Sequence, residues 1–453
     1  MPDVRGRGRT ALVLLCTAVF LDSMDLSLMG VALPAIGREL SLTEGTLQWL
    51  VSGYAVTYGG FLLLGGRLAD LLGRRRVFVL SLAVFAAASL AGGLLSSGVP
   101  LVVTRIVKGL AAALTAPAAL SLITTTFTDP AQRGRALGVY SLAGAAGYTG
   151  GLVLSGLLTD LSWRLVFFLP VPFALLVVVL TPLVIAPGER AGSGRGFDAL
   201  GAVTGTGAVL LGVYALAERA WPAGVLAVLL LLAFVLVQRR QANPLVPLAV
   251  FRVPSVRSAN TAAIAWACAT IGWQFAAVLH LQRTLHYDAL ATGLAIAPMG
   301  LAIFLAANLA GKLIARWGLG RTAALGMLLQ ACGILLFLRV EPTSGYLAVL
   351  APALVVHGIG NGLSFPSLNI AAVSDLPEHQ QGLASGLITS AVQVGAGIGV
   401  AVLAALLTVP GLTGYRLAFL AASGFSLVGA VVSALGIRPA QRTPRSTPAP
   451  AHH

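Results

Sequence analysis

The chain has 453 residues, of which 57% are hydrophobic and only 10% charged, and its formal net charge is +14. A soluble domain of this length needs a more polar surface, so this composition excludes the soluble classes of protein. A basic balance would suggest nucleic acid in a soluble protein, but here membrane topology accounts for the charge, and no nucleic-acid partner is expected.

Apolar stretches of about 20 residues, long enough to cross a bilayer, run through the whole chain. A helix satisfies the backbone hydrogen bonds of such a stretch without water. Cutting the chain at its polar connections predicts fourteen spans: 11–36, 47–67, 77–96, 99–121, 136–159, 165–186, 198–217, 222–238, 257–281, 291–315, 322–338, 346–370, 383–409 and 417–437. The predicted fold is therefore an all-α, polytopic membrane protein.

The distribution of charge predicts the orientation. With a cytoplasmic N-terminus and alternating loops, 21 of the 29 Lys and Arg fall on the cytoplasmic side and six fall outside. Positive residues are enriched in the cytoplasmic loops of membrane proteins. Both termini are thus expected on the cytoplasmic side of the cell (inner) membrane, with residues 438–453 as a disordered tail.

The first predicted cytoplasmic loop carries the sequence GRLADLLGRR at residues 66–75. It resembles the G-x-L-a-D-x-x-G-R-[RK] signature of the major facilitator superfamily. A glycine at position 73 permits a tight turn, and an aspartate can pair with an arginine or a helix N-terminus. The resemblance implies a cytoplasmic latch between two halves of a transporter; its expected members are Gly66, Asp70, Gly73, Arg74 and, as charge partner, Arg133. A topogenic anchor, which needs only the arginines, is the alternative.

A second copy of this pattern, GKLIARWG, lies at residues 311–318, with the same seven-residue separation of its glycines and Ala315 in place of the aspartate. Duplicated halves are a common build of transporters. With eight predicted spans between equivalent positions, the chain resembles the fourteen-helix drug:proton antiporter family, in which two helices are inserted between six-helix bundles. The expected units are 1–186, 187–243 (linker and inserted helices), 244–437 and the tail 438–453.

Two further stretches are similar to segments of that family. The sequence DLSLMGVALP at 25–34 resembles D-x-T-x-x-N-V-A-L-P, with Ser27 and Gly30 as departures. Gly138, Gly147 and Gly151 have the spacing of the antiporter motif, but Leu152 stands where the family has Pro. The resemblance implies proton antiport, although this motif does not secure it.

Four charged residues lie deep in predicted spans: Asp22, Asp25, Arg105 and Lys108. Charges inside a membrane are costly and often functional. Two interpretations stay open, a neutral cluster that holds two helices together and a proton relay. Asp25 is favoured as the proton carrier because the family motif begins there; Asp22 either shares the proton or lies near the outer mouth.

A substrate pocket between the halves should be mostly apolar, with a few polar and aromatic groups. The candidates are Gln48, Tyr54, Trp266, Trp273, Gln274, Asn361 and Gln393. For each Trp, interfacial anchoring is an equally open role.

The predicted function is a secondary transporter, not an enzyme, that exports an amphipathic drug or natural product in exchange for protons. No cofactor or metal ion is expected, since the chain has no nucleotide-binding loop and no metal-ligand spacing. The partners are then a small molecule, protons and the lipid bilayer, and a monomer is expected. An importer or uniporter without antiport and a non-transporting membrane sensor or scaffold remain as alternatives.

Overall fold

A computed structural model describes residues 4–127, 129–186, 198–241, 244–340 and 345–437. The described chain is helical throughout. Its α-helices are α1 Val4–Glu39, α2 Glu44–Leu72, α3 Arg74–Leu94, α4 Gly98–Thr126, α5 Pro130–Leu161, α6 Arg164–Phe168, α7 Pro170–Val184, α8 Ala199–Ala217, α9 Trp221–Arg240, α10 Pro254–Arg283, α11 Ala289–Trp317, α12 Leu319–Leu336, α13 Ala351–Val373, α14 Glu378–Leu407 and α15 Leu412–Gly436. Short turns of other helix types are η1 Leu248–Arg252, η2 Phe337–Arg339 and η3 Tyr346–Leu350.

The all-α, polytopic character is confirmed, but the number of spans differs from the fourteen expected. Within the described residues, twelve helices are long and apolar enough to cross a membrane, and Leu200–Leu216 is a shorter apolar helix within α8. The remaining helix, α2, is 29 residues long but is not among the twelve. Polar residues such as Gln48, Ser52 and Thr57 lie in its first half.

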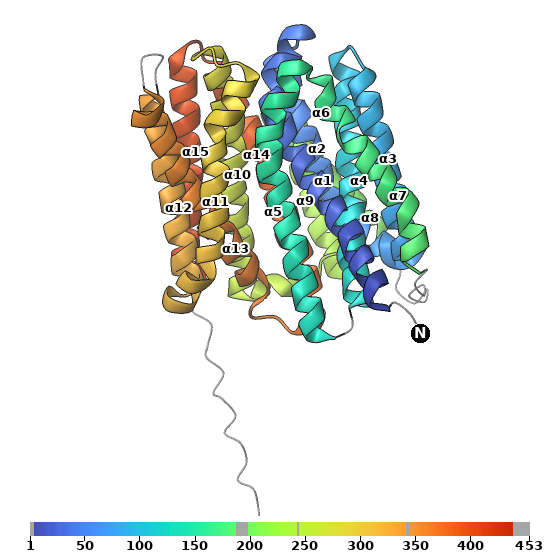
Figure 1. Cartoon of the computed structure of the whole chain (residues 1–453). Coiled ribbons are helices and arrows are strands. Elements are labelled where there is room, and N and C mark those ends of the chain that lie inside the picture. Colours follow the sequence, from blue (N-terminus) through green and yellow to red (C-terminus); the bar gives the residue numbers. More distant parts are fainter. Residues whose placement is uncertain (1–3, 128, 187–197, 242–243, 341–344, 438–453) are drawn as a thin grey trace, which may run out of the picture.

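The helices form two groups that stand side by side in Figure 1. In the first helix group, α1–α7, α1 packs on α5 and α2 packs on α4; in the second helix group, α10–α15, α10 packs on α14 and α15 and α12 packs on α13. The helix α8 packs on α9 and also contacts α2 and α14, one from each group. The described chain begins and ends on the same face, which we call the terminal face; the opposite face is the distal face.

The two groups meet mainly in their distal halves. A Cβ atom on Gly293 of α11 would lie only 3.1 Å from Gly156 Cα of α5. Small residues of this kind let two helices approach closely. Near the terminal face, by contrast, Gly138 of α5 and Gly382 of α14 have no atom of another segment within 4 Å of a Cβ position. The seam between the groups is therefore closely packed in its distal half.

Equivalent glycines form the turns after α2 and after α11. Gly73 has a φ of +98° and Gly318 has a φ of +85°. The tight turn predicted at Gly73 is confirmed, and the second copy of the sequence pattern makes the same helix–glycine–helix turn. Glycine adopts a positive φ without the steric cost that other residues meet there.

Candidate functional site

Three of the four intramembrane charges form one buried cluster between α1 and α4. The Asp25 carboxylate accepts hydrogen bonds from Arg105 through one oxygen and from Lys108 through the other. All three side chains are at most 1% exposed. The spacing of three residues between the two bases puts both on the same face of α4, so that one carboxylate can reach both.

Aromatic rings and a backbone carbonyl complete this cluster. Arg105 Nε donates to the carbonyl oxygen of Leu50 on α2 at 2.8 Å, and its guanidinium lies 4.6 Å from the centre of the Tyr54 ring. The Lys108 ammonium lies 4.6 Å from the centre of the Phe85 ring. Such cation–π contacts are stronger when desolvated. The cluster therefore ties α1 to α2, α3 and α4 within the first helix group.

Asp22 has a different environment from Asp25. Its carboxylate accepts a hydrogen bond from the Tyr54 hydroxyl, and Tyr58 packs edge-on against Tyr54 with ring centres 5.9 Å apart. No cation pairs with Asp22 among the described residues. Its side chain is partly exposed, whereas that of Asp25 is sealed.

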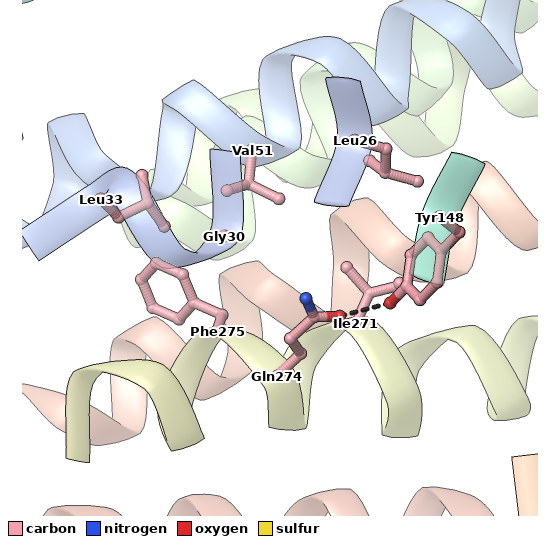
Figure 2. Close-up of a pocket in the computed structure, with 8 residues that line it drawn as sticks. All are labelled: Leu26, Gly30, Leu33, Val51, Tyr148, Ile271, Gln274 and Phe275. Atoms are coloured by element: carbon pink, nitrogen blue, oxygen red, sulfur yellow. Dashed lines mark hydrogen bonds between the residues drawn. The ribbon is translucent and has the colours of Figure 1, made fainter. Parts of the chain in front are cut away.

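A pocket lies between the two helix groups, one helical turn along α1 from Asp22 (Figure 2). It encloses about 300 Å³ of space free of atoms, part of which is open to solvent. The lining residues are Leu26, Gly30 and Leu33 of α1, Val51 of α2, Tyr148 of α5, and Ile271, Gln274 and Phe275 of α10. Tyr148 Oη donates to Gln274 Oε1 at 2.5 Å, which links the two groups across the pocket.

Of the seven substrate-contact candidates, only Gln274 lines this pocket, and Tyr54 lies beside it at Asp22. Trp273 stacks on His357, with ring centres 4.1 Å apart, and Trp266 stacks on Phe365 at 5.0 Å. Both Trp side chains thus pack inside the second helix group instead of facing the pocket or anchoring at an interface. The remaining candidates are buried elsewhere: Gln48 on α2, Asn361 on α13 and Gln393 on α14.

Of the three glycines of the α5 motif, Gly147 and Gly151 pack against α1 and Gly138 does not. A Cβ atom on Gly147 would lie 3.0 Å from Phe20 Cα, and one on Gly151 would lie 2.8 Å from the Met24 carbonyl oxygen. These two glycines let α5 pack closely on α1, near the charged residues. Gly138 is exposed and has no such contact. Leu152, in place of the family's Pro, is fully buried where α5 meets the second helix group.

The residues of the expected latch lie around the α2–α3 turn on the terminal face. Gly66 faces Pro117 of α4, and Arg74 begins α3. Arg133 Nε donates to the Phe127 carbonyl oxygen at 3.2 Å. The side chain of Asp70 lies outside the described residues, so its expected pairing with Arg133 stays a prediction.

A polar network near the terminal face is centred on Asp198, which precedes α8. It joins α8 and α9 to the segment that follows α9. Asp198 caps α8 by accepting from Gly201 N at 2.8 Å, and it also accepts from Gln238 Nε2 at 2.6 Å and Leu245 N at 3.0 Å. Burial by itself raises the pKa of this carboxyl, but these three hydrogen bonds outweigh burial and hold the pKa below its ordinary value.

Known proteins share both this sequence pattern and this fold. The model of the Major Facilitator Superfamily matches residues 15–400 and 262–453. The chain belongs to the major facilitator superfamily. The puromycin resistance protein pur8 of Streptomyces alboniger is 37% identical over 407 residues, which cover 86% of this chain and 80% of that protein. The cephamycin export protein CmcT of Amycolatopsis lactamdurans is 36% identical, covering 89% and 85%.

A solved structure shares the fold. The POT family transporter PepTSo superposes with a TM-score of 0.72 at 14% identity, covering 94% of this chain and 97% of that one. At this identity the likeness concerns the fold alone. The curated relatives place the chain in the drug-efflux branch of the superfamily, and it is a membrane transporter, not an enzyme.

Sequence reasoning about this superfamily member missed Gly30, Tyr58, Tyr148 and Asp198 as parts of a site. Tyr58 follows Tyr54 by one helical turn, a spacing that could have indicated a shared partner. Gly30 stood out only as a departure from the family motif. Tyr148 gave no signal, because the pocket joins helices that are far apart in the chain.

Proposed function

We propose that this transporter exports a small amphipathic molecule of the antibiotic type in exchange for protons. The observation that carries the proposal is an apolar pocket between the two helix groups, with a partly exposed carboxylate, Asp22, one helical turn away. Relatives that cover most of the chain are named for puromycin resistance and for cephamycin export, which supports antibiotics as the substrate class.

The proposed topology has fourteen spans, with six in residues 1–186, two in the unit 187–243 and six in residues 244–437. Two observations support counting α2 and α8 as spans beyond the twelve long apolar helices. The helix α2 contacts both α4 and α14, and α8 pairs with α9. The terminal face is cytoplasmic in this proposal, because the fourteen-span topology assigns 21 of the 29 Lys and Arg to the side of the termini.

Asp22 is the proposed proton carrier, and Asp25 anchors α1 to α4. An antiporter needs a group that gains a proton on one side and loses it on the other. Asp25 is sealed and held by two cations, which favour its charged form, whereas Asp22 is partly exposed and held by the Tyr54 hydroxyl. Because Asp22 and Leu26 share one face of α1, a bound substrate would lie beside the proton site.

Export is tested in an efflux-deficient bacterium that expresses the chain. We expect raised resistance to puromycin or to another compound in a panel of charged and uncharged antibiotics, compared with cells carrying an empty vector. Inverted membrane vesicles from these cells should accumulate that compound when their interior is acid, and nigericin, which collapses the pH gradient, should stop the accumulation. Equal resistance with and without the protein across the panel would contradict the proposal.

A further inference from the structure

The pocket between the helix groups presents a single polar face to a ligand. Apart from Tyr148 and Gln274, its lining side chains are apolar or absent, and none of the lining residues is charged. Charged residues of the neighbouring cluster point away from it, since Asp25 faces α4. Recognition inside the pocket itself therefore depends on hydrogen bonds made by these two residues.

The amide of Gln274 has its oxygen paired and its nitrogen turned toward α1. Tyr148 Oη donates to Oε1 at 2.5 Å, so the amide nitrogen is the end that remains. Figure 2 shows this nitrogen pointing away from Tyr148 and toward α1. No residue in the described part of the chain accepts a hydrogen bond from it, although the side chain is only 6% exposed. The nitrogen is therefore available to donate to a ligand that enters the pocket.

Gly30 makes room for that donor. A Cβ atom at this position would lie 3.1 Å from Gln274 Nε2, closer than side chains normally approach. The similar family motif has Asn at this position, and an Asn side chain would occupy the space in front of the amide. The departure at Gly30 and the free amide of Gln274 thus fit one another.

We propose that Gln274 is the hydrogen-bond donor that recognises an acceptor oxygen, a carbonyl or an ether, on the apolar part of the exported molecule. The proposal rests on the proposed export function and narrows its substrate class. Tyr148 is the positioning residue, because its hydroxyl holds the Oε1 end of the amide. Gly30 is the residue that keeps the donor accessible.

The test uses two rigid probes that differ in one group, fluorenone with its carbonyl and fluorene with a methylene in its place. Binding is measured calorimetrically to the full chain in lipid nanodiscs, and empty nanodiscs correct for partition into lipid. We expect the wild type to bind fluorenone about tenfold more tightly than fluorene, as one neutral hydrogen bond allows. Gln274→Leu should bring this ratio close to one while fluorene affinity is kept.

A second variant and a matched control guard against misfolding. Gly30→Ala should also reduce the ratio, because the new methyl group crowds the amide. Gln282→Leu is the control: Gln282 is a buried glutamine of the same helix whose Nε2 already donates to Val31 O at 3.0 Å, so its loss should leave the ratio unchanged.

A wild-type ratio near one, or an unchanged ratio in a folded Gln274→Leu protein, would overturn the inference. So would failure of the wild type to bind either probe. Export of puromycin or another antibiotic would still be measurable in each of these cases, so the failure of this inference is distinguishable from the failure of the proposed function.

Discussion

Two aspartates three residues apart on α1 have unlike partners, and the roles proposed for them rest on this difference. Asp25 meets two buried cations of α4, whereas Asp22 meets the hydroxyl of Tyr54 on α2. Residues three apart on a helix share a side of it but are turned by about 60° relative to each other. That turn is enough to direct one carboxylate to α4 and the other to α2.

Removing the charge of Asp25 should destabilise the protein. In Asp25→Asn, Arg105 and Lys108 remain buried without a counter-charge, and the loss of one partner of a buried ion pair costs about 3–5 kcal/mol. We expect a clearly lower melting temperature in detergent, measured by intrinsic fluorescence. The double variant Asp25→Asn with Lys108→Met should melt above the single variant, because it leaves one unpaired cation instead of two. If the single variant melts like the wild type, the cluster does not anchor α1.

The Asp198 network should make stability depend on pH in a defined direction. Because the folded pKa of this carboxyl is below its ordinary value, its stabilising effect is complete above the ordinary pKa and is lost as pH falls through the folded value. We expect Asp198→Ala to cost about 2–3 kcal/mol at neutral pH. The gap in melting temperature between the variant and the wild type should shrink below about pH 4.

Asp129 offers a matched control for this effect. It caps α5 through one exposed hydrogen bond, to Gln132 N at 2.8 Å. Asp129→Ala should cost only about 1 kcal/mol, since it loses a single cap. Equal losses in the two variants would mean that the Gln238 and Leu245 contacts of Asp198 contribute nothing.

Among the helices and turns, the turns at Gly73 and Gly318 have the same construction. Each one joins two long helices through a single residue with a positive φ, and each follows a copy of the same sequence pattern. The turn could be predicted from the sequence because a glycine between charged residues interrupts two apolar runs. The number of fourteen spans stays a prediction: twelve helices within the described residues are long and apolar enough to cross a membrane, and Leu200–Leu216 is a shorter apolar helix.

Replacing Gly73 by Ala should destabilise the α2–α3 turn by about 1–2 kcal/mol, the cost of a left-handed backbone for a residue with a Cβ atom. Thermal unfolding measures this loss, and transport assays show whether the turn also matters for the cycle. Gly138→Ala is the control: this glycine lies within α5 with open space around it, and there alanine should be neutral or stabilising. A Gly73→Ala protein as stable as the wild type would argue against a strained turn.

Which candidate residues line the pocket could not be predicted from the sequence. Gln274 was a candidate because a polar residue inside a span draws attention, and it does line the pocket. Trp266 and Trp273 drew attention for the same reason, yet each stacks on another ring within its own helix group. Which face of α10 meets the other group depends on the packing of α1, α5 and α14, and no local pattern in α10 records it.

At the scale of the molecule, closure of the distal face depends on contacts between the groups. Arg283 of α10 pairs with Glu44 of α2. In the turn after α8, Glu218 accepts from Trp49 Nε1 of α2 at 3.3 Å, while Arg219 donates to Thr408 after α14 at 3.4 Å. A transporter that releases its substrate distally must break these contacts in every cycle.

Cross-linking this pair should therefore stop transport. The variant carries Cys at positions 44 and 283, its three native cysteines are replaced by Ala, and a bismaleimide reagent joins the two thiols. We expect loss of uptake into inverted vesicles after cross-linking and not before. The control joins positions 39 and 164, whose Glu and Arg form an ion pair inside the first helix group, and it should remain active. Uptake by the protein cross-linked between 44 and 283 would show that the distal face need not open.

The central claim, that proton exchange at Asp22 drives export, is tested most directly by gradient-driven uptake of puromycin, or of the antibiotic that the resistance screen identifies, into inverted vesicles. We expect Asp22→Asn to lose acid-interior uptake while it retains counterflow of labelled against unlabelled compound, because Asn can still accept a hydrogen bond from Tyr54 but cannot carry a proton. Acid-driven uptake by Asp22→Asn at the wild-type level would contradict the account.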